Sequence, residues 1–300
     1  MTRRSLTDAP ALPKIRSALL AWYSAAHRDF PWRRTSDPYA VLVSEVMLQQ
    51  TQASRVALRF PLFMERFPSV EALAHATESE VLAAWSGLGY NRRALALRRA
   101  AAKVAATGWP RDIATLERMP GIGPYTARAL LSLAFGEPVG AVDTNVRRWL
   151  MRRFGLAPAI PPRDLQRLAD GLAQAGDAAD AAAWTHASME FGAAICASRS
   201  PRCETCPVAE GCPSRANPGR VTVPRQAVFA GSDRALRGAL LRALTSAPEH
   251  SLGLASARKL CPGPDFERIV RRLEVDRLVH RSGARLHLGG PPEPAATIGT

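Results

Sequence analysis

The sequence predicts an all-α protein that ends in a small winged-helix-like module. Apolar residues recur with helical periodicity from residue 11 to residue 195, and Pro or Gly residues separate the periodic segments. No segment with convincing strand alternation precedes residue 215. Hydrophobic residues make up 47% of the 300 positions, which is enough for a proper core.

The helices are expected in the following order. An amphipathic helix over 11–29 comes first. A longer helix over 38–60 follows, because Asp37–Pro38 supplies an N-cap and a proline at the first helical position. Further helical segments end at Pro or Gly stops, and they cover 69–76, 78–86, 91–107, 112–118, 124–135, 143–154, 162–175 and 177–195.

A change in composition predicts the domain organisation. Residues 214–232 are rich in Pro, Gly and Arg, which is typical of a linker. The first domain is therefore expected over 1–213, a second module over 233–290 and a tail over 291–300.

The second module is expected to combine helices with one hairpin. Helices are predicted at 233–246, 251–260 and 265–279, followed by two short strands around Ser282–Gly283. Three helices followed by a hairpin resemble a winged helix. A plain capping bundle is the alternative.

The charge of the chain favours a polyanionic partner. The formal net charge is +14, and the basic residues are 37 Arg and three Lys. A nucleic-acid backbone is the commonest polyanion that such a charge attracts. No run of about eighteen apolar residues is present, and the first ten residues are too polar for a signal peptide. We expect a cytoplasmic, nucleoid-associated monomer that does not bind membranes.

Four cysteines lie close together in the pattern Cys-x6-Cys-x2-Cys-x5-Cys. Four closely spaced thiolates can supply the complete ligand set of a [4Fe–4S] cluster. Zinc sites usually contain two Cys-x2-Cys pairs, and only one is present here. Disulfides fit a long chain without a secretory signal poorly. The cluster is therefore the preferred interpretation over zinc and disulfides, and its ligands would be Cys196, Cys203, Cys206 and Cys212.

The segment Leu116–Ala127 predicts two helices joined by a glycine hairpin. Gly121 and Gly123 permit a tight turn with close backbone approach. The N–H groups at the start of the second helix can then bind a phosphate oxygen without reading the base sequence. This segment resembles the helix–hairpin–helix DNA-binding motif.

An apolar run that ends in Asp143 follows the hairpin. Considered alone, Asp143 could be only an N-cap. The order of helix–hairpin–helix motif, Val-Asp-Thr-Asn-Val run and four-cysteine loop, however, resembles the endonuclease III-like DNA glycosylase superfamily. This resemblance covers residues 11–215.

The run Ser44–Gln52, Ser-Glu-Val-Met-Leu-Gln-Gln-Thr-Gln, indicates a particular branch of that superfamily. Alone, it would be a surface Glu followed by helix-end amides. It closely resembles the signature of the MutY family of adenine DNA glycosylases. The runs Phe30–Arg33, Asp37–Tyr39, Gly87–Tyr90 and Met189–Cys196 match the same family.

The resemblance implies an activity. The family hydrolyses the N-glycosidic bond of adenine mispaired with 8-oxoguanine or guanine in double-stranded DNA and leaves an abasic site for base excision repair. Bifunctional members of the superfamily carry a lysine nucleophile two residues after the second hairpin glycine, where this chain has Tyr125. Lyase chemistry is therefore disfavoured, and a monofunctional hydrolase is expected.

The resemblance also implies catalytic roles. Glu45 would protonate N7 of adenine, and Asp143 would face the oxocarbenium-like sugar as a carboxylate. Tyr125 and Asn145 would position the reacting groups. We expect burial to raise the pKa of Glu45, and we expect helix N-terminal N–H groups to keep Asp143 ionised.

The adenine must leave the duplex to be reached. By resemblance, its pocket would be lined by Arg28, Trp32, Arg33 and Glu190. Gln50 would fill the gap that the adenine leaves in the base stack, and Thr51 would contact the opposite base. Leu88 and Tyr90 would insert as a wedge beside that opposite base. Leu88 and Trp32 could instead be core residues, although the surrounding Gly-Leu-Gly-Tyr sequence favours an exposed loop for Leu88.

Backbone contacts are expected from the hairpin and from basic residues. The residues assigned to the DNA backbone are Gly121, Gly123, Arg147, Arg199 and Arg202. Arg148 is expected to reach the backbone as well, whereas about half of the arginine pairs, such as Arg92–Arg93, are expected to lie on solvated helix faces.

The C-terminal part departs from the family. Typical members carry a β-rich domain resembling MutT that helps to recognise 8-oxoguanine, and the last seventy or so residues here do not resemble it. Recognition would then depend on the first domain or on tail arginines, namely Arg268, Arg271, Arg272 and Arg281. Two rival functions remain: a thymine glycosylase for T·G mismatches, and a non-catalytic DNA-binding or iron–sulfur sensor protein.

Overall fold

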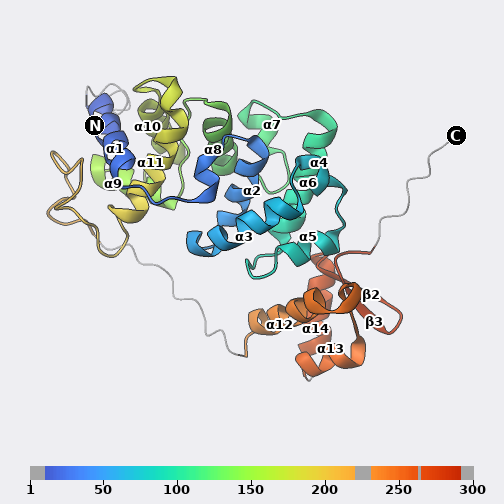
Figure 1. Cartoon of the computed structure of the whole chain (residues 1–300). Coiled ribbons are helices and arrows are strands. Elements are labelled where there is room, and N and C mark those ends of the chain that lie inside the picture. The colour runs from blue at the N-terminus through green and yellow to red at the C-terminus, as the bar shows by residue number, and fades with distance from the viewer. Residues whose placement is uncertain (1–10, 220–230, 263–264, 292–300) are drawn as a thin grey trace. The chain divides into compact units, whose positions relative to one another are not determined.

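The computed structural model describes residues 11–219, 231–262 and 265–291 (Figure 1). It consists mainly of helices that divide into two compact units, each built from two stretches of chain. The first unit is Met1–Val46 with Pro110–Pro224, and the second is Met47–Trp109 with Arg225–Thr300. Much of the expected linker and nearly all of the expected tail lie outside the described residues. Among the described helices, none is both long and apolar enough to cross a membrane.

The first unit is an all-helical bundle around one core. Its helices are α1 (Leu12–Ala26), α2 (Pro38–Leu48, which runs to the unit boundary), α7 (Ile113–Glu117), α8 (Pro124–Phe135), α9 (Thr144–Phe154), α10 (Pro162–Gln174) and α11 (Ala181–Ala194). Helix α11 packs against α1, α8 and α9. The centre of this core contains Trp149 and Phe191, whose ring centroids are 5.6 Å apart in an edge-to-face arrangement.

The second unit begins with four helices. They are α3 (Ala53–Arg66), α4 (Val70–His75), α5 (Glu78–Ala84) and α6 (Arg92–Thr107). The rings of Phe63, Phe67 and Trp85 form edge contacts in their core. Ser69 and Thr77 begin α4 and α5 by accepting backbone N–H groups, and Thr77 forms a full capping box with Glu80.

The C-terminal part of the second unit consists of three helices and a small sheet (Figure 1). The helices are α12 (Asp233–Ser246), α13 (Leu254–Leu260) and α14 (Asp265–Val275). The strands β1 (Ser251–Gly253), β2 (Val279–Ser282) and β3 (Arg285–Leu288) pair antiparallel in the order β1-β3-β2. Glu78 of α5 accepts hydrogen bonds from Gly290 N at 2.8 Å and Arg277 Nε at 3.2 Å.

The predicted hairpin around Ser282–Gly283 is confirmed, and Gly283 has a φ of +54° in the turn. The helix expected over 251–260 is wrong at its start, because residues 251–253 form β1. Ser251 is buried there, and its hydroxyl accepts hydrogen bonds from Arg285 of β3. This pairing satisfies polar groups that a helix start would leave open.

The single helix expected over 38–60 is also wrong. Helix α2 ends at Leu48 and α3 begins at Ala53, with Gln50 between them at a φ of +56°. The Arg93 guanidinium binds the carbonyls of Met47 and Gln49, at 2.9 and 2.5 Å. These carbonyls are therefore engaged by a side chain where a continuous helix would use backbone N–H donors.

Candidate active site and DNA-contact loops

Glu45 lies in the middle of α2 among buried apolar side chains. It is 3% exposed, and its Oε2 has no hydrogen-bond partner within the described residues. Burial raises the pKa of Glu45 to about 7, and the nearby Asp143 charge raises it as well, while Tyr125 and Arg33 oppose the shift. At neutral pH a large fraction of Glu45 therefore carries a proton that it can donate.

Asp143 is the N-cap of α9. Its Oδ1 accepts a hydrogen bond from Val146 N and its Oδ2 accepts one from Asn145 Nδ2, both at 2.7 Å. These bonds lower the pKa of Asp143, as expected. Burial raises it more strongly, however, so the pKa of Asp143 lies above its usual value. The expected Asn145 contact is present, and it fixes the orientation of the carboxylate.

Tyr125 lies at the start of α8 and interacts electrostatically with both carboxyl groups. Burial, together with Glu45 and Asp143, raises the pKa of its hydroxyl well above the usual value, so it stays a neutral phenol. The hydroxyl donates to Met189 Sδ at 2.8 Å. The structure therefore brings Glu45, Asp143 and Tyr125 together.

Arg148 extends a chain of hydrogen bonds from Asp143 toward the cysteine loop. It donates to Asn145 Oδ1 at 2.9 Å, to Gly192 O at 2.5 Å and to Cys196 O at 2.8 Å. These bonds engage the guanidinium inside the protein and do not support the expected contact of Arg148 with the DNA backbone. A Cβ at Gly192 would lie 2.6 Å from Asn145 O, so α9 and α11 need glycine here.

Glu190 binds two arginines that were assigned to the adenine pocket. Arg28 donates to both carboxylate oxygens at 2.6 and 2.9 Å, and Arg33 Nη2 donates at 2.7 Å. Burial raises the pKa of Glu190, but the two arginines outweigh this and leave it lowered. Trp32 is 5% exposed and stacks on Phe30 with centroids 4.7 Å apart. The structure thus collects Arg28, Arg33 and Glu190 into one polar cluster.

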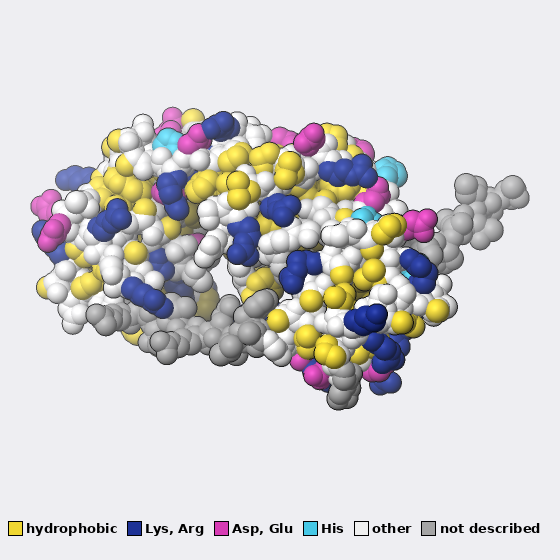
Figure 2. Space-filling view, turned by 60° about the horizontal axis from the view of Figure 1, so that its bottom comes forward, with side chains coloured by type: hydrophobic (Ala, Val, Ile, Leu, Met, Phe, Trp, Pro, Cys, Tyr) yellow, Lys and Arg dark blue, Asp and Glu magenta, His cyan; other side chains and the backbone are white. Residues whose placement is uncertain are grey.

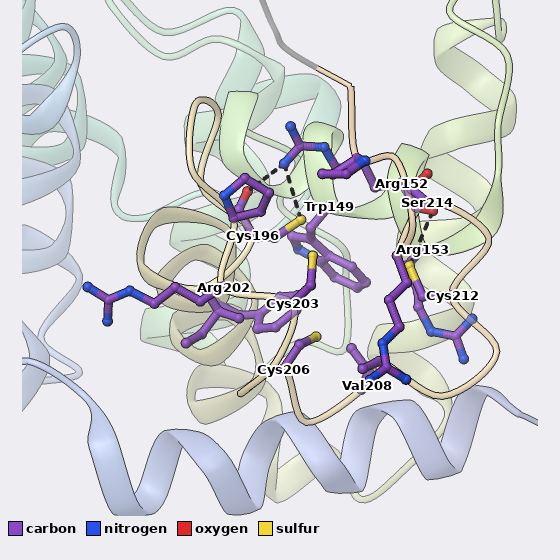
Figure 3. A pocket seen from close by; sticks show the side chains of 16 residues that line it. Trp149, Arg152, Arg153, Cys196, Arg202, Cys203, Cys206, Val208, Cys212 and Ser214 are labelled. Atoms are coloured by element: carbon purple, nitrogen blue, oxygen red, sulfur yellow. Dashed lines mark hydrogen bonds between the residues drawn. The ribbon is translucent and has the colours of Figure 1, made fainter.

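The four cysteines of the loop line one pocket (Figure 3). All four are free thiols, and none is paired in a disulfide. Arg152 donates to Cys196 Sγ at 3.6 Å and also binds the Cys196 and Ala197 carbonyls. Within the described residues, no group of Cys, His, Asp or Glu side chains is already arranged to hold a metal ion. The four thiols that line the pocket nevertheless fit a four-thiolate cluster in number and chemistry.

The turn after α2 and the loop before α6 lie in the second unit, and Arg93 links them. Its Nη2 lies 3.0 Å from both Thr51 Oγ1 and Gly89 O. Its guanidinium also lies over the rings of Trp85 and Tyr90, 5.3 and 5.6 Å from the centroids. Burial lowers the pKa of Arg93 to about 10. Arg93 is therefore not one of the arginines on a solvated helix face, whereas its neighbour Arg92 is 74% exposed.

Two residues assigned to the DNA duplex have left-handed backbone conformations. Gln50 has a φ of +56° and Tyr90 a φ of +47°, and both side chains are exposed. Such conformations are costly for residues other than glycine and often mark functional sites. Leu88 differs from expectation, since it is only 2% exposed. Its carbonyl accepts a hydrogen bond from Thr51 Oγ1 at 3.4 Å, which links the loop to the turn after α2.

The hairpin between α7 and α8 has the expected geometry. Gly121 has a φ of +78°, and Gly123 is the extended N-cap of α8 with nothing within 4 Å of a built Cβ. Arg147 donates to Pro158 O at 3.4 Å, whereas Arg199 and Arg202 are exposed. Figure 2 shows Lys and Arg side chains over much of one face, in keeping with the net charge of +14.

Three residues of this machinery escaped the sequence analysis: Met189, Arg93 and Arg152. Met189 lies within the quoted run Met189–Cys196, and its helical neighbour Glu190 was already assigned. The two arginines bind mainly backbone carbonyls, and such contacts leave no residue pattern in the sequence.

Comparison with known proteins assigns the family. Residues 43–174 match the HhH-GPD superfamily of base excision DNA repair proteins. The adenine DNA glycosylase of Mycobacterium tuberculosis (strain H37Rv) is 42% identical over 240 residues, which are 76% of this chain and 78% of the relative. The human adenine DNA glycosylase is 39% identical over 224 residues, which are 69% of this chain and 40% of the human protein.

Solved structures share the fold. A thermostable thymine-DNA glycosylase covers 69% of this chain and 99% of its own, with 30% identity and a TM-score of 0.62. Endonuclease III in a trapped covalent DNA intermediate covers 72% of this chain and 98% of its own, with 22% identity and a TM-score of 0.58. The chain therefore belongs to the HhH-GPD superfamily of base excision DNA repair proteins and, within it, to the adenine DNA glycosylases, so it is a DNA N-glycosylase.

Proposed function

We propose that the protein is a monofunctional adenine DNA glycosylase that removes adenine paired with 8-oxoguanine or guanine and leaves an abasic site. The observation that carries this proposal is Glu45, a buried carboxyl with one unpartnered oxygen and a pKa near neutrality. Adenine is a poor leaving group, and protonation of N7 by such an acid makes it a better one. A rival thymine glycosylase would not need this acid.

The second carboxyl complements the first. Asp143 faces the same site, and its two hydrogen bonds favour the carboxylate over the acid. As positive charge develops on the deoxyribose, a carboxylate in this position stabilises it. Asn145 holds one oxygen of Asp143, and Arg148 in turn binds Asn145. The pair therefore divides the reaction into proton donation by Glu45 and charge stabilisation by Asp143.

Tyr125 supports hydrolysis without strand cleavage. A lyase forms a Schiff base through an amine nucleophile. The residue in that place here is a phenol whose pKa is raised well above its usual value, so it supplies no nucleophile for the sugar. The DNA product would therefore contain an abasic site in an unbroken strand.

The four cysteines would hold a [4Fe–4S] cluster. When bound, the cluster would crosslink the loop and thereby fix the positions of Arg199 and Arg202 for phosphate contacts. Iron and acid-labile sulfide assays on protein purified without oxygen should each give about four atoms per chain. One zinc per chain without sulfide would contradict the assignment.

Single-turnover base release tests the proposed reaction. The duplexes carry A·8-oxoG, A·G, T·G or A·T, and strand cleavage is scored with and without alkali. We expect adenine release from A·8-oxoG and A·G, a nick only after alkali, and a loss of about 1,000-fold in Glu45→Gln. Thymine release from T·G would move the protein to the thymine branch. Binding without base release would make it a non-catalytic DNA-binding protein.

A further inference from the structure

A cleft of about 870 Å³ lies within the second unit. One wall is the turn after α2 and the loop before α6, and the other is one face of α12. The residues from the two loops include Gln50, Thr51, Leu88 and Tyr90, which the sequence assigned to the duplex around the vacated stack. The same cleft is therefore lined both by residues assigned to the duplex and by the C-terminal module.

The charge of the cleft is positive. Arg55, Arg234, Arg237 and Arg242 line it, and its one acidic residue, Asp233, is ion-paired with Arg268. Arg237 donates to Asp276 at 2.9 Å and is thereby fixed within the module. These ion pairs leave an excess of arginine along one wall.

Arg242 is the arginine best placed to receive a ligand. It is exposed, and a Cβ built on Gly238 would lie 3.2 Å from its Nη1. The guanidinium thus extends back along α12, over a residue without a side chain. Arg234, Gly238 and Arg242 are spaced four residues apart, so they share the face of α12 that lines the cleft.

The lining suits a nucleotide. Leu82, Leu241 and Leu278 supply apolar surface for a base, and Gln50, Gln52 and Asn91 supply amides for its polar edge. The volume lies in the range of pockets that bind small molecules of about this size. A guanidinium can grip a phosphate with two parallel hydrogen bonds.

We propose that this cleft binds a nucleotide of the DNA strand opposite the excised adenine, with Arg242 of α12 on its phosphate. The proposal rests on the proposed function, because that function brings a base opposite the adenine to Thr51 and Tyr90. The winged-helix-like module would thus contact the lesion strand in a chain without the β-rich domain. The expectation that Arg268 and Arg281 do so is not supported, because both are paired with carboxylates of their own module.

Charge reversal of one arginine tests the cleft. Arg242→Glu should bind an A·8-oxoG duplex about tenfold more weakly than the wild-type chain, and the slope of log affinity against log salt should fall by about one. Lys259→Glu is the matched control, because Lys259 is exposed on α13 of the same module and does not line the cleft. Its affinity should stay within twofold of the wild-type value. Equal losses in the two variants would overturn the proposal.

Neutral phosphates locate the contact. Methylphosphonates are placed one at a time along each strand of the duplex, and binding is measured for the wild-type chain and Arg242→Ala. At the phosphate of the 8-oxoguanine strand that Arg242 contacts, a methylphosphonate should weaken binding by the wild-type chain about fivefold. The same methylphosphonate should not weaken binding by Arg242→Ala any further. The proposal would be overturned if the losses of affinity from the methylphosphonate and from Arg242→Ala added up at every position. It would also be overturned if the position where they do not add up lay on the adenine strand.

The two proposals can fail separately. If the wild-type chain released no adenine from any duplex, the proposed function would fail, while these binding measurements would still decide whether Arg242 contacts a phosphate. If adenine were released and Arg242→Glu behaved as Lys259→Glu does, only the cleft proposal would fail. Thermal unfolding of each variant checks that the module is folded, and Arg242→Lys, which keeps the charge, should retain most of the affinity.

Discussion

Glu45 and Gln50 are five residues apart in the sequence, yet their settings are opposite. Glu45 is buried in a regular helix, and Asp143 caps another regular helix. Gln50, like Tyr90, is exposed on a left-handed backbone in a turn. The groups assigned to catalysis thus depend on helix positions and burial, whereas the groups assigned to the duplex depend on strained turns.

The two regions are stabilised differently. Burial itself raises the pKa of Glu45, so the apolar surroundings of α2 would be part of the proposed chemistry. In the turns, the Arg93 side chain binds backbone carbonyls of both segments, at Gln49 and at Gly89. Catalysis should therefore be sensitive to changes of charge at the buried carboxyl groups. Binding of the mismatch should be sensitive to the loss of the Arg93 side chain.

The largest expected effect follows from removing the charge of Asp143. Asn is also a good N-cap, so Asp143→Asn should keep α9 folded. Without the carboxylate, the single-turnover rate of adenine release should fall about 1,000-fold, because the developing sugar charge loses its partner. Asp112→Asn is a matched control, since Asp112 caps α7 in the same way. A loss of less than tenfold for Asp143→Asn would show that the carboxylate has no part in the chemistry.

The next effect concerns Arg93, which connects the turn after α2 to the loop before α6. Arg93→Ala leaves the carbonyls of Met47, Gln49 and Gly89 without this donor. We expect a loss of about 3 kcal/mol in unfolding free energy, measured by urea denaturation, and weaker mismatch binding. The neighbouring Arg92 is 74% exposed, so Arg92→Ala should cost less than about 0.5 kcal/mol. Similar costs for the two variants would contradict the role of Arg93.

A smaller expected effect is the pH dependence that Glu45 gives to the free energy of unfolding. Its pKa is raised to about 7 in the folded chain, so the wild-type protein loses stability as pH rises from about 4.5 to about 7. Glu45→Gln has no such loss and should be more stable than the wild type by up to about 3 kcal/mol at pH 8, with little of this advantage at pH 4.5. Urea denaturation at both pH values measures the difference. A constant difference would contradict the raised pKa.

Much of the first unit could be predicted from the sequence. The bounds of α8 matched expectation because a glycine precedes Pro124 and another follows Phe135. Glu45, Tyr125 and Asp143 were assigned to catalysis because they lie in three separate runs that resemble one family. The turns were harder, since the break between α2 and α3 depends on the left-handed backbone of Gln50 and on the distant side chain of Arg93.

The remaining differences have a common physical origin. The inward direction of Arg148 and the burial of Leu88 depend on tertiary contacts with carbonyls and apolar side chains far away in the sequence. β1 is only three residues long, too short to show alternation, and it forms because β3 is available to pair with it. The division of the chain into domains near residues 213 and 233 stays a prediction.

The pH dependence of adenine release tests the central role of Glu45 most directly. The single-turnover rate on an A·8-oxoG duplex is measured at saturating protein from pH 5.5 to pH 9. With an acid of pKa about 7, the rate should be nearly level below pH 6 and should fall about tenfold per pH unit above pH 8. The residual rate of Glu45→Gln should not show this fall. A wild-type rate that stays level or rises from pH 7 to pH 9 would contradict proton donation by Glu45.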